Sequence, residues 1–149
     1  MVSACFGREN LSLARAREAA QEAITIAGLE DRSGMLAMHL TIAGKKRLEL
    51  ARALAARPLL LLLDEVLAGL NPTEIREIVP VIRKLCARGI TIVMIEHVMQ
   101  AVMSLSEHIF VLAEGRIIAE GTPAQVAADR AVIEAYLGQG AAKKFGGQA

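Results

Sequence analysis

Tryptophan is absent from this 149-residue sequence, aromatic residues make up only 3% of it, and there are just two cysteines. Since 54% of the residues are nevertheless apolar, we expect a core built from Leu, Ile, Val, Ala and Met. Cys5 and Cys86 lie far apart and form no CxxC pair, which suggests a reducing compartment. We expect Cys86 to be buried by packing.

An excess of charge of one sign is also missing, because 17 basic and 16 acidic residues leave a net charge of +1. This balance argues against a nucleic-acid binder that works through a large basic surface. The longest apolar run, Pro58–Leu63, is far shorter than the roughly 20 residues that span a bilayer, and the N-terminus does not resemble a signal peptide. With 22% charged residues and abundant Leu and Ile, the chain is not expected to be disordered, and its length predicts about one domain.

Apolar residues at spacings of three and four predict several helices. Asn71-Pro72-Thr73-Glu74 and Thr122-Pro123-Ala124-Gln125 each combine an N-cap residue, proline at the first helical position and a capping-box side chain. Pro80 predicts a kink or a break in the helix that starts after Asn71. The expected helices cover residues 12–27, 44–56, 72–88, 98–104, 123 onward and 131–137.

Between the helices lie short apolar or β-branched runs that predict strands at 59–63, 90–95, 108–112 and 116–119. The first run follows Pro58 and ends abruptly in acids, so we expect a strand buried on both faces. A tight turn at Glu114-Gly115 is expected to join the last two strands. Strands that alternate with helices predict an α/β fold with a mainly parallel sheet and flanking helices.

Two carboxylates, Asp64 and Glu65, end the first predicted strand. The carboxyl edge of a parallel sheet is where α/β folds bind ligands. In a nucleotide hydrolase the first acid can hold Mg²⁺ through water and the second can orient or deprotonate the attacking water. Alternatively, the two acids merely end a strand and begin a solvated loop. His97, which directly follows the predicted strand at 90–95 and Glu96, is either a functional side chain at the same edge or a packed core histidine.

Further motifs stand in a fixed order around these residues: Arg47-Leu48-Glu49-Leu50-Ala51-Arg52-Ala53-Leu54-Ala55 before the acids, Ala68-Gly69-Leu70-Asn71-Pro72 after them, and then Glu96-His97. In this order and spacing the chain resembles the ATP-binding subunit of an ABC transporter. The ending Val132-Ile133-Glu134-Ala135-Tyr136-Leu137-Gly138 resembles the branch that serves branched-chain amino acid importers. The alternative is a small unrelated α/β domain, which requires all these spacings to be coincidental.

The resemblance implies a role for each matching residue. Asp64 corresponds to the Walker B carboxylate that holds Mg²⁺ through water, Glu65 to the catalytic base, and His97 to the switch histidine that contacts the γ-phosphate. Residues 68–71, which end at Asn71, correspond to the D-loop that touches the partner subunit.

The segment Leu40-Thr41-Ile42-Ala43-Gly44 stands where the family carries its LSGGQ signature. There a hydroxyl and backbone N–H groups at a helix start hold the γ-phosphate of ATP bound to the other subunit. Thr41 keeps a hydroxyl, but Ile42 and Ala43 replace two glycines and Gly44 replaces Gln, so this signature is degenerate. The basic run at 45–47 either adds positive charge near a phosphate or is a solvated turn of helix.

No phosphate-binding loop of the form GxxxxGK[ST] occurs in the sequence, because the only Gly-Lys pair, Gly44-Lys45, has no glycine five residues before it. The family's Q-loop and adenine-stacking aromatic are not found either. The resemblance therefore implies a partial P-loop NTPase fold without the Walker A strand. It divides the chain into a remnant of the helical subdomain (1–40), the C-terminal part of the nucleotide-binding domain (41–137) and a flexible tail (138–149).

In the family, the Walker A strand lies between the strand that ends before His97 and the strand near residues 108–112. Without it, two apolar edges would face water, so we expect the isolated chain to re-pair its strands or to oligomerise through the exposed edges.

The resemblance implies an ATPase that couples ATP binding and hydrolysis to import of branched-chain amino acids when complete. Its cofactors are ATP and Mg²⁺, and its partners are a second ATPase subunit in a head-to-tail dimer and membrane permease subunits, without nucleic acid. It would be cytoplasmic and peripheral at the inner face of the cell membrane. For this chain alone we expect no bound cofactor and negligible ATPase activity. The alternative is a truncated, inactive remnant or a protein-interaction module.

Overall fold

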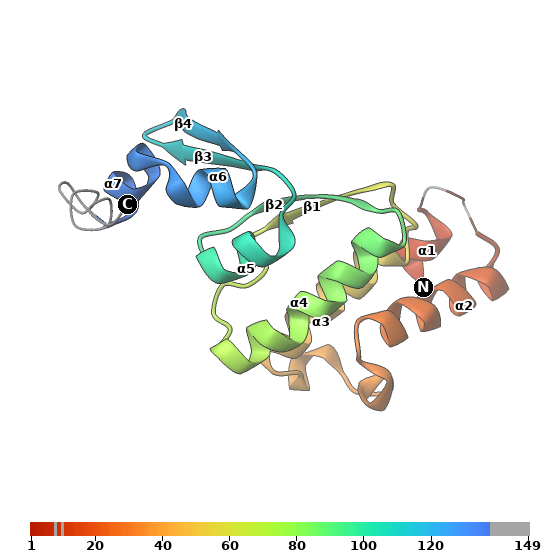
Figure 1. Ribbon diagram of the computed structural model, residues 1–149. Coiled ribbons are helices and arrows are strands. Elements are labelled where there is room, and N and C mark those ends of the chain that lie inside the picture. Colours follow the sequence, from red (N-terminus) through yellow and green to blue (C-terminus); the bar gives the residue numbers. More distant parts are fainter. Residues whose placement is uncertain (8, 10, 138–149) are drawn as a thin grey trace. The chain divides into compact units, whose positions relative to one another are not determined.

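A computed structural model of the chain describes residues 1–7, 9 and 11–137 (Figure 1). The predicted tail at 138–149 lies outside the described residues. The chain divides into two compact units, Met1–Ala101 and Val102–Ala149. Its helices are α1 (Val2–Cys5), α2 (Leu13–Ile26), α3 (Ile42–Leu54), α4 (Pro72–Ala87), α5 (Met99–Leu105), α6 (Pro123–Ala128) and α7 (Arg130–Leu137), with short 3₁₀ turns at Glu30–Arg32 and Ala37–His39. Its strands are β1 (Leu60–Asp64), β2 (Thr91–Ile95), β3 (Ile109–Ala113) and β4 (Arg116–Gly121).

Small residues allow helix α2 to pack closely in the first unit. Its buried positions are all alanines, Ala16, Ala19 and Ala23, and alanine adds little bulk between two helix backbones. α3 buries Leu50, Ala51 and Leu54. The predicted stop of α2 is confirmed, because Gly28 adopts a φ of 66°, a left-handed conformation that glycine accepts without strain.

Strands β1 and β2 form a two-stranded parallel sheet in which Leu61 pairs with Ile92 and Leu63 with Met94. Leu61 and Leu63 are only 6% and 7% exposed, and Figure 1 shows α3 and α4 on one side of these strands. Leu60 and Leu62, whose side chains point the other way, are 51% and 69% exposed. The predicted burial of β1 on both faces is therefore wrong, since helices of the described residues cover one face only.

Helix α4 begins with the predicted capping box. The Asn71 side chain accepts hydrogen bonds from the N–H groups of Thr73 (2.9 Å) and Glu74 (3.0 Å), and Glu74 accepts from the Asn71 N–H (2.9 Å). The apolar face of α4 is buried through Ile78, Val81, Ile82 and Leu85.

Two expectations for α4 need correction. Of the two predicted outcomes at Pro80, the break is wrong, because the helix runs unbroken through this residue. Pro80 lies on the exposed side, where water can satisfy the Arg76 carbonyl that loses its helical partner. Cys86 is exposed rather than buried, because it is one position beyond the apolar face that ends at Leu85.

The second unit is built around the β3–β4 hairpin. The predicted tight turn is confirmed, with positive φ at Glu114 (49°) and Gly115 (74°), as hairpins of matching twist require. α6 starts with the predicted capping box between Thr122 and Gln125. The core of this unit consists of Ile109, Val126 and Val132, with Val102, Met103, Val111 and Ala119 packed against them.

Both sheets within the described residues have two strands, β1 with β2 and β3 with β4. The expected re-pairing of the strand that ends at Ile95 with a further strand is therefore not present in that part of the chain. No helix in the described ranges is both long and apolar enough to cross a membrane.

The one-sided burial of β1 predicts opposite outcomes for adjacent leucines. Leu61→Ala removes buried methyl groups and is expected to lower the free energy of unfolding by about 2–5 kcal/mol. Leu62→Ala, in the same strand but exposed, is expected to lower it by less than about 1 kcal/mol. Urea unfolding followed by circular dichroism measures both. Equal losses for the two variants would contradict the one-sided arrangement.

Candidate site at the carboxyl ends of the parallel strands

The parallel pairing of β1 and β2 brings their carboxyl ends to one edge. Asp64 is the last residue of β1 and pairs with Ile95, the last residue of β2. The Glu65 N–H then donates to the Ile95 carbonyl (2.9 Å), which extends the ladder by one bond. Glu65 has a φ of 45°, an uncommon left-handed conformation for a residue with a side chain. The chain therefore turns sharply after Asp64 and leaves both carboxylates exposed at this edge.

Histidine 97 lies beside Glu65. Its Nδ1 atom is 3.6 Å from Oε1 of Glu65, and both side chains are more than half exposed. The pair attracts electrostatically only when the imidazole is protonated. Glu65 and His97 therefore lie together at the edge where the sequence predicted them. The alternative of a packed core histidine is wrong, because the His97 side chain is 68% exposed.

Glutamate 96 has a contact that sequence reasoning missed. Its Oε1 atom accepts a hydrogen bond from the Leu67 N–H (2.7 Å), and its Oε2 atom is buried without a hydrogen-bond partner. Leu67 itself is almost fully buried. Glu96 therefore ties the loop that follows Glu65 to the end of β2. The sequence feature that could have predicted this contact is the acidic residue directly after the strand that pairs with β1.

The N-terminal part of α3 lies against this loop. The Lys46 ammonium group is 3.4 Å from the Glu65 carbonyl oxygen, which it can donate to. Ile42 lies close to Gly69, since a Cβ built on Gly69 would be 3.9 Å from Cγ2 of Ile42. The structure thus brings the segment at 40–44 next to the loop at 65–71, although they are distant in sequence.

Threonine 41 serves as the N-cap of α3. Its hydroxyl oxygen accepts a hydrogen bond from the Gly44 N–H (3.1 Å), so α3 begins at Ile42 and not at the expected Gly44. Gly44 is buried, and a Cβ there would lie 3.2 Å from Cβ of Leu40. Ile42 and Ala43 occupy the first two helical positions, and Ile42 is exposed.

Asn71 has a structural role as the N-cap of α4. The loop that carries it starts at Glu65 and includes Gly69, whose φ of 78° is left-handed. Asn71 is exposed, so a partner could reach its side chain. Because the same side chain caps α4, it would have to contact the partner while it keeps that role.

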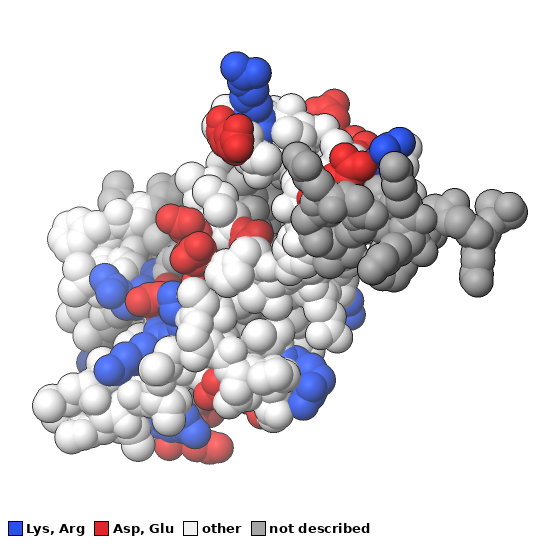
Figure 2. All heavy atoms as spheres, turned by 90° about the vertical axis from the view of Figure 1, so that its left-hand side faces the viewer, with Lys and Arg blue, Asp and Glu red and all other residues white. Residues whose placement is uncertain are grey.

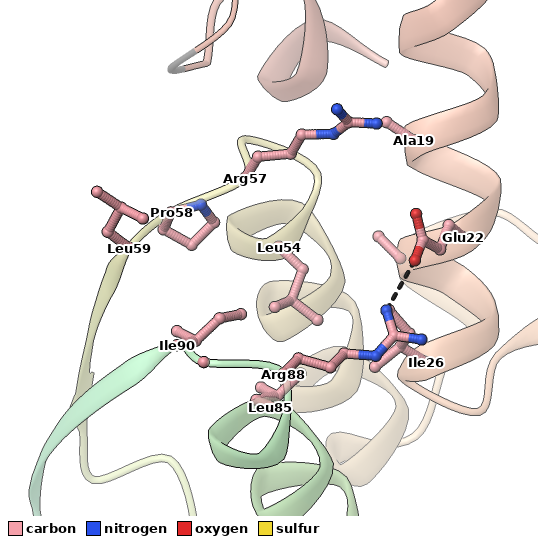
Figure 3. A pocket seen from close by; sticks show the side chains of 12 residues that line it. Ala19, Glu22, Ile26, Leu54, Arg57, Pro58, Leu59, Leu85, Arg88 and Ile90 are labelled. Carbon is pink, nitrogen blue, oxygen red and sulfur yellow. Dashed lines mark hydrogen bonds and ion pairs between the residues drawn. The ribbon is translucent and has the colours of Figure 1, made fainter.

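A cavity lies at the opposite ends of the strands, away from these residues. It has a volume of about 280 Å³ and is lined by α2, by the C-terminal ends of α3 and α4, and by Leu59 and Ile90, which directly precede β1 and β2 (Figure 3). Arg88 at its rim pairs with Glu22 (2.7 Å) and Arg57 with Glu9 (2.6 Å). None of the predicted site residues lines this cavity.

Charge of both signs occurs on the face of the molecule that Figure 2 shows. Figure 2 shows acidic and basic side chains interspersed among uncharged ones on the face in view. The described residues contain no group of three or more His, Cys, Asp or Glu side chains arranged to hold a metal ion. A Mg²⁺ site at Asp64 would therefore rely on one carboxylate, with water and phosphate oxygens as further ligands, which is a common arrangement for this ion.

The sequence of this chain is similar to those of ATP-binding proteins of branched-chain amino acid transport. The family model described as "Branched-chain amino acid ATP-binding cassette transporter" matches residues 116–142. The high-affinity branched-chain amino acid transport ATP-binding protein BraF of Pseudomonas aeruginosa is 46% identical over 96 residues, which cover 64% of this chain and 38% of BraF. The corresponding protein LivG of Escherichia coli K12 is 41% identical over 113 residues, covering 75% of this chain and 44% of LivG. The chain thus spans less than half the length of these two relatives.

Solved structures give the same result for the fold. A crystal structure of the ADP conformation of MJ1267, an ATP-binding cassette of an ABC transporter, matches 90% of this chain and 54% of its own chain with a TM-score of 0.77 and 29% identity. The chain therefore belongs to the ATP-binding subunits of ABC transporters, which have the P-loop NTPase fold. Within this family it is similar to ATP-binding proteins of branched-chain amino acid transport, to which the matching family model also belongs. The predicted family and fold class are confirmed.

The contact of Glu96 predicts a local effect on the loop. Glu96→Ala leaves the part-buried Leu67 N–H without its acceptor, at an expected cost of about 1–3 kcal/mol in the free energy of unfolding. Hydrogen exchange at the Leu67 amide is expected to accelerate. Glu96→Gln keeps the oxygen acceptor and serves as the matched control. Unchanged exchange at Leu67 in the alanine variant would contradict the assigned contact.

Proposed function

We propose that this chain supplies the Mg²⁺-binding, water-activating and partner-facing residues of an ABC transporter ATPase that drives import of branched-chain amino acids. The observation that carries the proposal is the placement of Asp64, Glu65 and His97 at one exposed edge of the parallel strands. This edge is where α/β folds bind nucleotides. The names of the relatives supply the transported substrate.

Each residue at the edge has a proposed task. Asp64 would hold Mg²⁺ through water, and the ion would supply positive charge that neutralises phosphate oxygens. Glu65 accepts a proton from the attacking water through its exposed carboxylate. His97, 3.6 Å from Glu65, contacts the γ-phosphate.

The remaining predicted residues face a second subunit in this proposal. Thr41, Ile42, Ala43 and Gly44 form a degenerate signature that faces ATP bound to the partner, and the loop ending at Asn71 touches the partner's nucleotide site. Their closeness in the structure, through Ile42 and Gly69, supports a shared surface. The side chains of Ile42 and Ala43 weaken phosphate binding there, because they keep the backbone N–H groups at a distance.

For the complete protein, we also propose its cofactors, its partners and its location. ATP and Mg²⁺ are its cofactors, while the chain alone binds neither. Its partners are a second ATPase subunit, head to tail, and membrane permease subunits, at the cytoplasmic face of the membrane. Residues 1–40 belong to the helical subdomain and 41–137 to the nucleotide-binding domain. In isolation the chain oligomerises through its exposed sheet edges.

A second candidate function is a protein-interaction module without ATPase activity. The exposed apolar side chains of Leu60 and Leu62 favour it, as does the lack of a GxxxxGK[ST] motif in the sequence. ATP hydrolysis distinguishes the two functions.

A chimera tests the proposed function. Residues 41–137 replace the matching segment of Escherichia coli LivG, and Mg²⁺-dependent ATP hydrolysis is measured. We expect activity that Glu65→Gln lowers by about 100-fold or more, since it removes a general base. Glu107→Gln, the same change at an exposed position in the second unit, is expected to leave the rate unchanged.

Two results would contradict the proposal. One is a Glu65→Gln chimera as active as the unaltered chimera. The other is a chimera that stays inactive after Ile42→Gly and Ala43→Gly restore the glycines of the signature. We expect this double change to raise the rate.

A further inference from the structure

Glutamate 96 holds the loop that directly follows the proposed base. Its Oε1 atom accepts the hydrogen bond from the Leu67 N–H at 2.7 Å. This distance is typical of hydrogen bonds to ionised acceptors, which are about twice as strong as those between neutral groups. Leu67 is the second residue after Glu65, so the bond restrains the chain immediately behind the base.

The backbone at Glu65 depends on restraint from both sides. Its φ of 45° is left-handed, and such a conformation persists in a residue with a side chain only where the surroundings fix it. On the strand side the Glu65 N–H donates to the Ile95 carbonyl (2.9 Å), and on the loop side the Glu65 carbonyl accepts from the Ala68 N–H (3.1 Å). Leu67, which Glu96 holds, lies between Glu65 and Ala68 and therefore inside this turn.

The carboxylate of Glu96 is not available to the attacking water. Its Oε1 atom is taken up by the Leu67 N–H, and its Oε2 atom is buried and has no hydrogen-bond partner in the described part of the chain. A buried acceptor without a donor is costly and rare in folded proteins. Any effect of Glu96 on the exposed edge must therefore pass through the loop.

Packing is the alternative restraint on the loop. Val66 and Leu67 are only 5% and 1% exposed, so their burial also holds the loop against the protein. Hydrophobic burial has no preferred direction, whereas a hydrogen bond has one. Because a single backbone conformation at Glu65 is a matter of direction, the bond from Glu96 is the restraint that can select it.

We propose that Glu96 is a positioning residue for the proposed ATP hydrolysis. By holding the Leu67 N–H it fixes the left-handed turn that presents the Glu65 carboxylate to the attacking water, and it contacts neither the nucleotide nor Mg²⁺. This inference rests on the proposed function, because Glu65 is the base of that function.

Hydrogen exchange in the 149-residue chain tests the turn without any catalysis. Glu96→Ala is expected to accelerate exchange about tenfold at the amides of Glu65 and Ala68, whose hydrogen bonds it does not remove directly, and to leave the β1–β2 ladder unchanged. Unchanged exchange at Glu65 and Ala68 would show that packing alone holds the turn and would overturn the proposal.

Kinetics of the LivG chimera test the link to hydrolysis. Glu96→Ala is expected to lower kcat about tenfold and to leave the KM for Mg²⁺-ATP within about twofold, because the nucleotide loses no contact. Glu96→Gln keeps an oxygen acceptor and is expected to stay within about threefold of the unaltered chimera. Glu107→Ala, which removes an exposed carboxylate in the second unit, is the control and is expected to change neither constant. Circular dichroism establishes that all variants fold.

A double variant separates positioning from a general loss of structure. If Glu96 acts through Glu65, then Glu96→Ala has no further effect on the residual rate once Glu65→Gln has removed the base.

Three kinetic results would overturn the proposal. They are an unchanged kcat in Glu96→Ala, a loss in Glu96→Gln as large as in Glu96→Ala, and a tenfold loss that Glu96→Ala repeats in the Glu65→Gln background. A chimera without activity would contradict the proposed function instead, and the exchange rates at Glu65 and Ala68 would then decide whether Glu96 fixes the turn.

Discussion

The parallel pairing of β1 with β2 is the constraint on which the rest of the site depends. The register that opposes Asp64 to Ile95 sets both strand ends at one edge, and the bond from the Glu65 N–H to the Ile95 carbonyl fixes where the chain turns. Glu96 and His97 follow β2 at that same edge. Glu96 accepts a hydrogen bond from the Leu67 N–H, and His97 lies beside Glu65. Burial of Leu61 and Leu63 on the inner face stabilises this register, since a slip by one residue would expose them.

Local signals in the sequence predicted much of the fold. The capping boxes at Asn71 and Thr122, the stop at Gly28 and the turn at Glu114-Gly115 depend on neighbouring residues only, and all are present. The faces of β1 were predicted wrongly because a run of leucines does not reveal which side lacks a covering element. A break at Pro80 was one of two predicted outcomes, but α4 continues through it, because water at this exposed position can satisfy the carbonyl that loses its helical partner.

The sequence predicted where the residues of the candidate site lie, but not their contacts with α3 and the following loop. Strand ends followed by acids and a histidine predicted that Asp64, Glu65 and His97 would meet at one edge, whereas their chemical roles come from the family resemblance. The contacts from Lys46 to the Glu65 carbonyl and from Glu96 to Leu67 join residues 19 and 29 positions apart. No local pattern encodes such contacts, because they depend on how α3 and the loop pack on the strands.

We propose that the edge at Asp64, Glu65 and His97 is one side of an ATP site and that the phosphate-binding side must come from further polypeptide. Isothermal titration of the 149-residue chain with Mg²⁺-ATP measures whether this edge holds the nucleotide without such a partner. We expect no saturable binding, or a Kd weaker than about 1 mM, because one carboxylate edge without a phosphate cradle offers little binding free energy. Saturable binding in the micromolar range, lost in an Asp64→Asn variant, would show that the chain holds nucleotide by itself and would overturn the proposal.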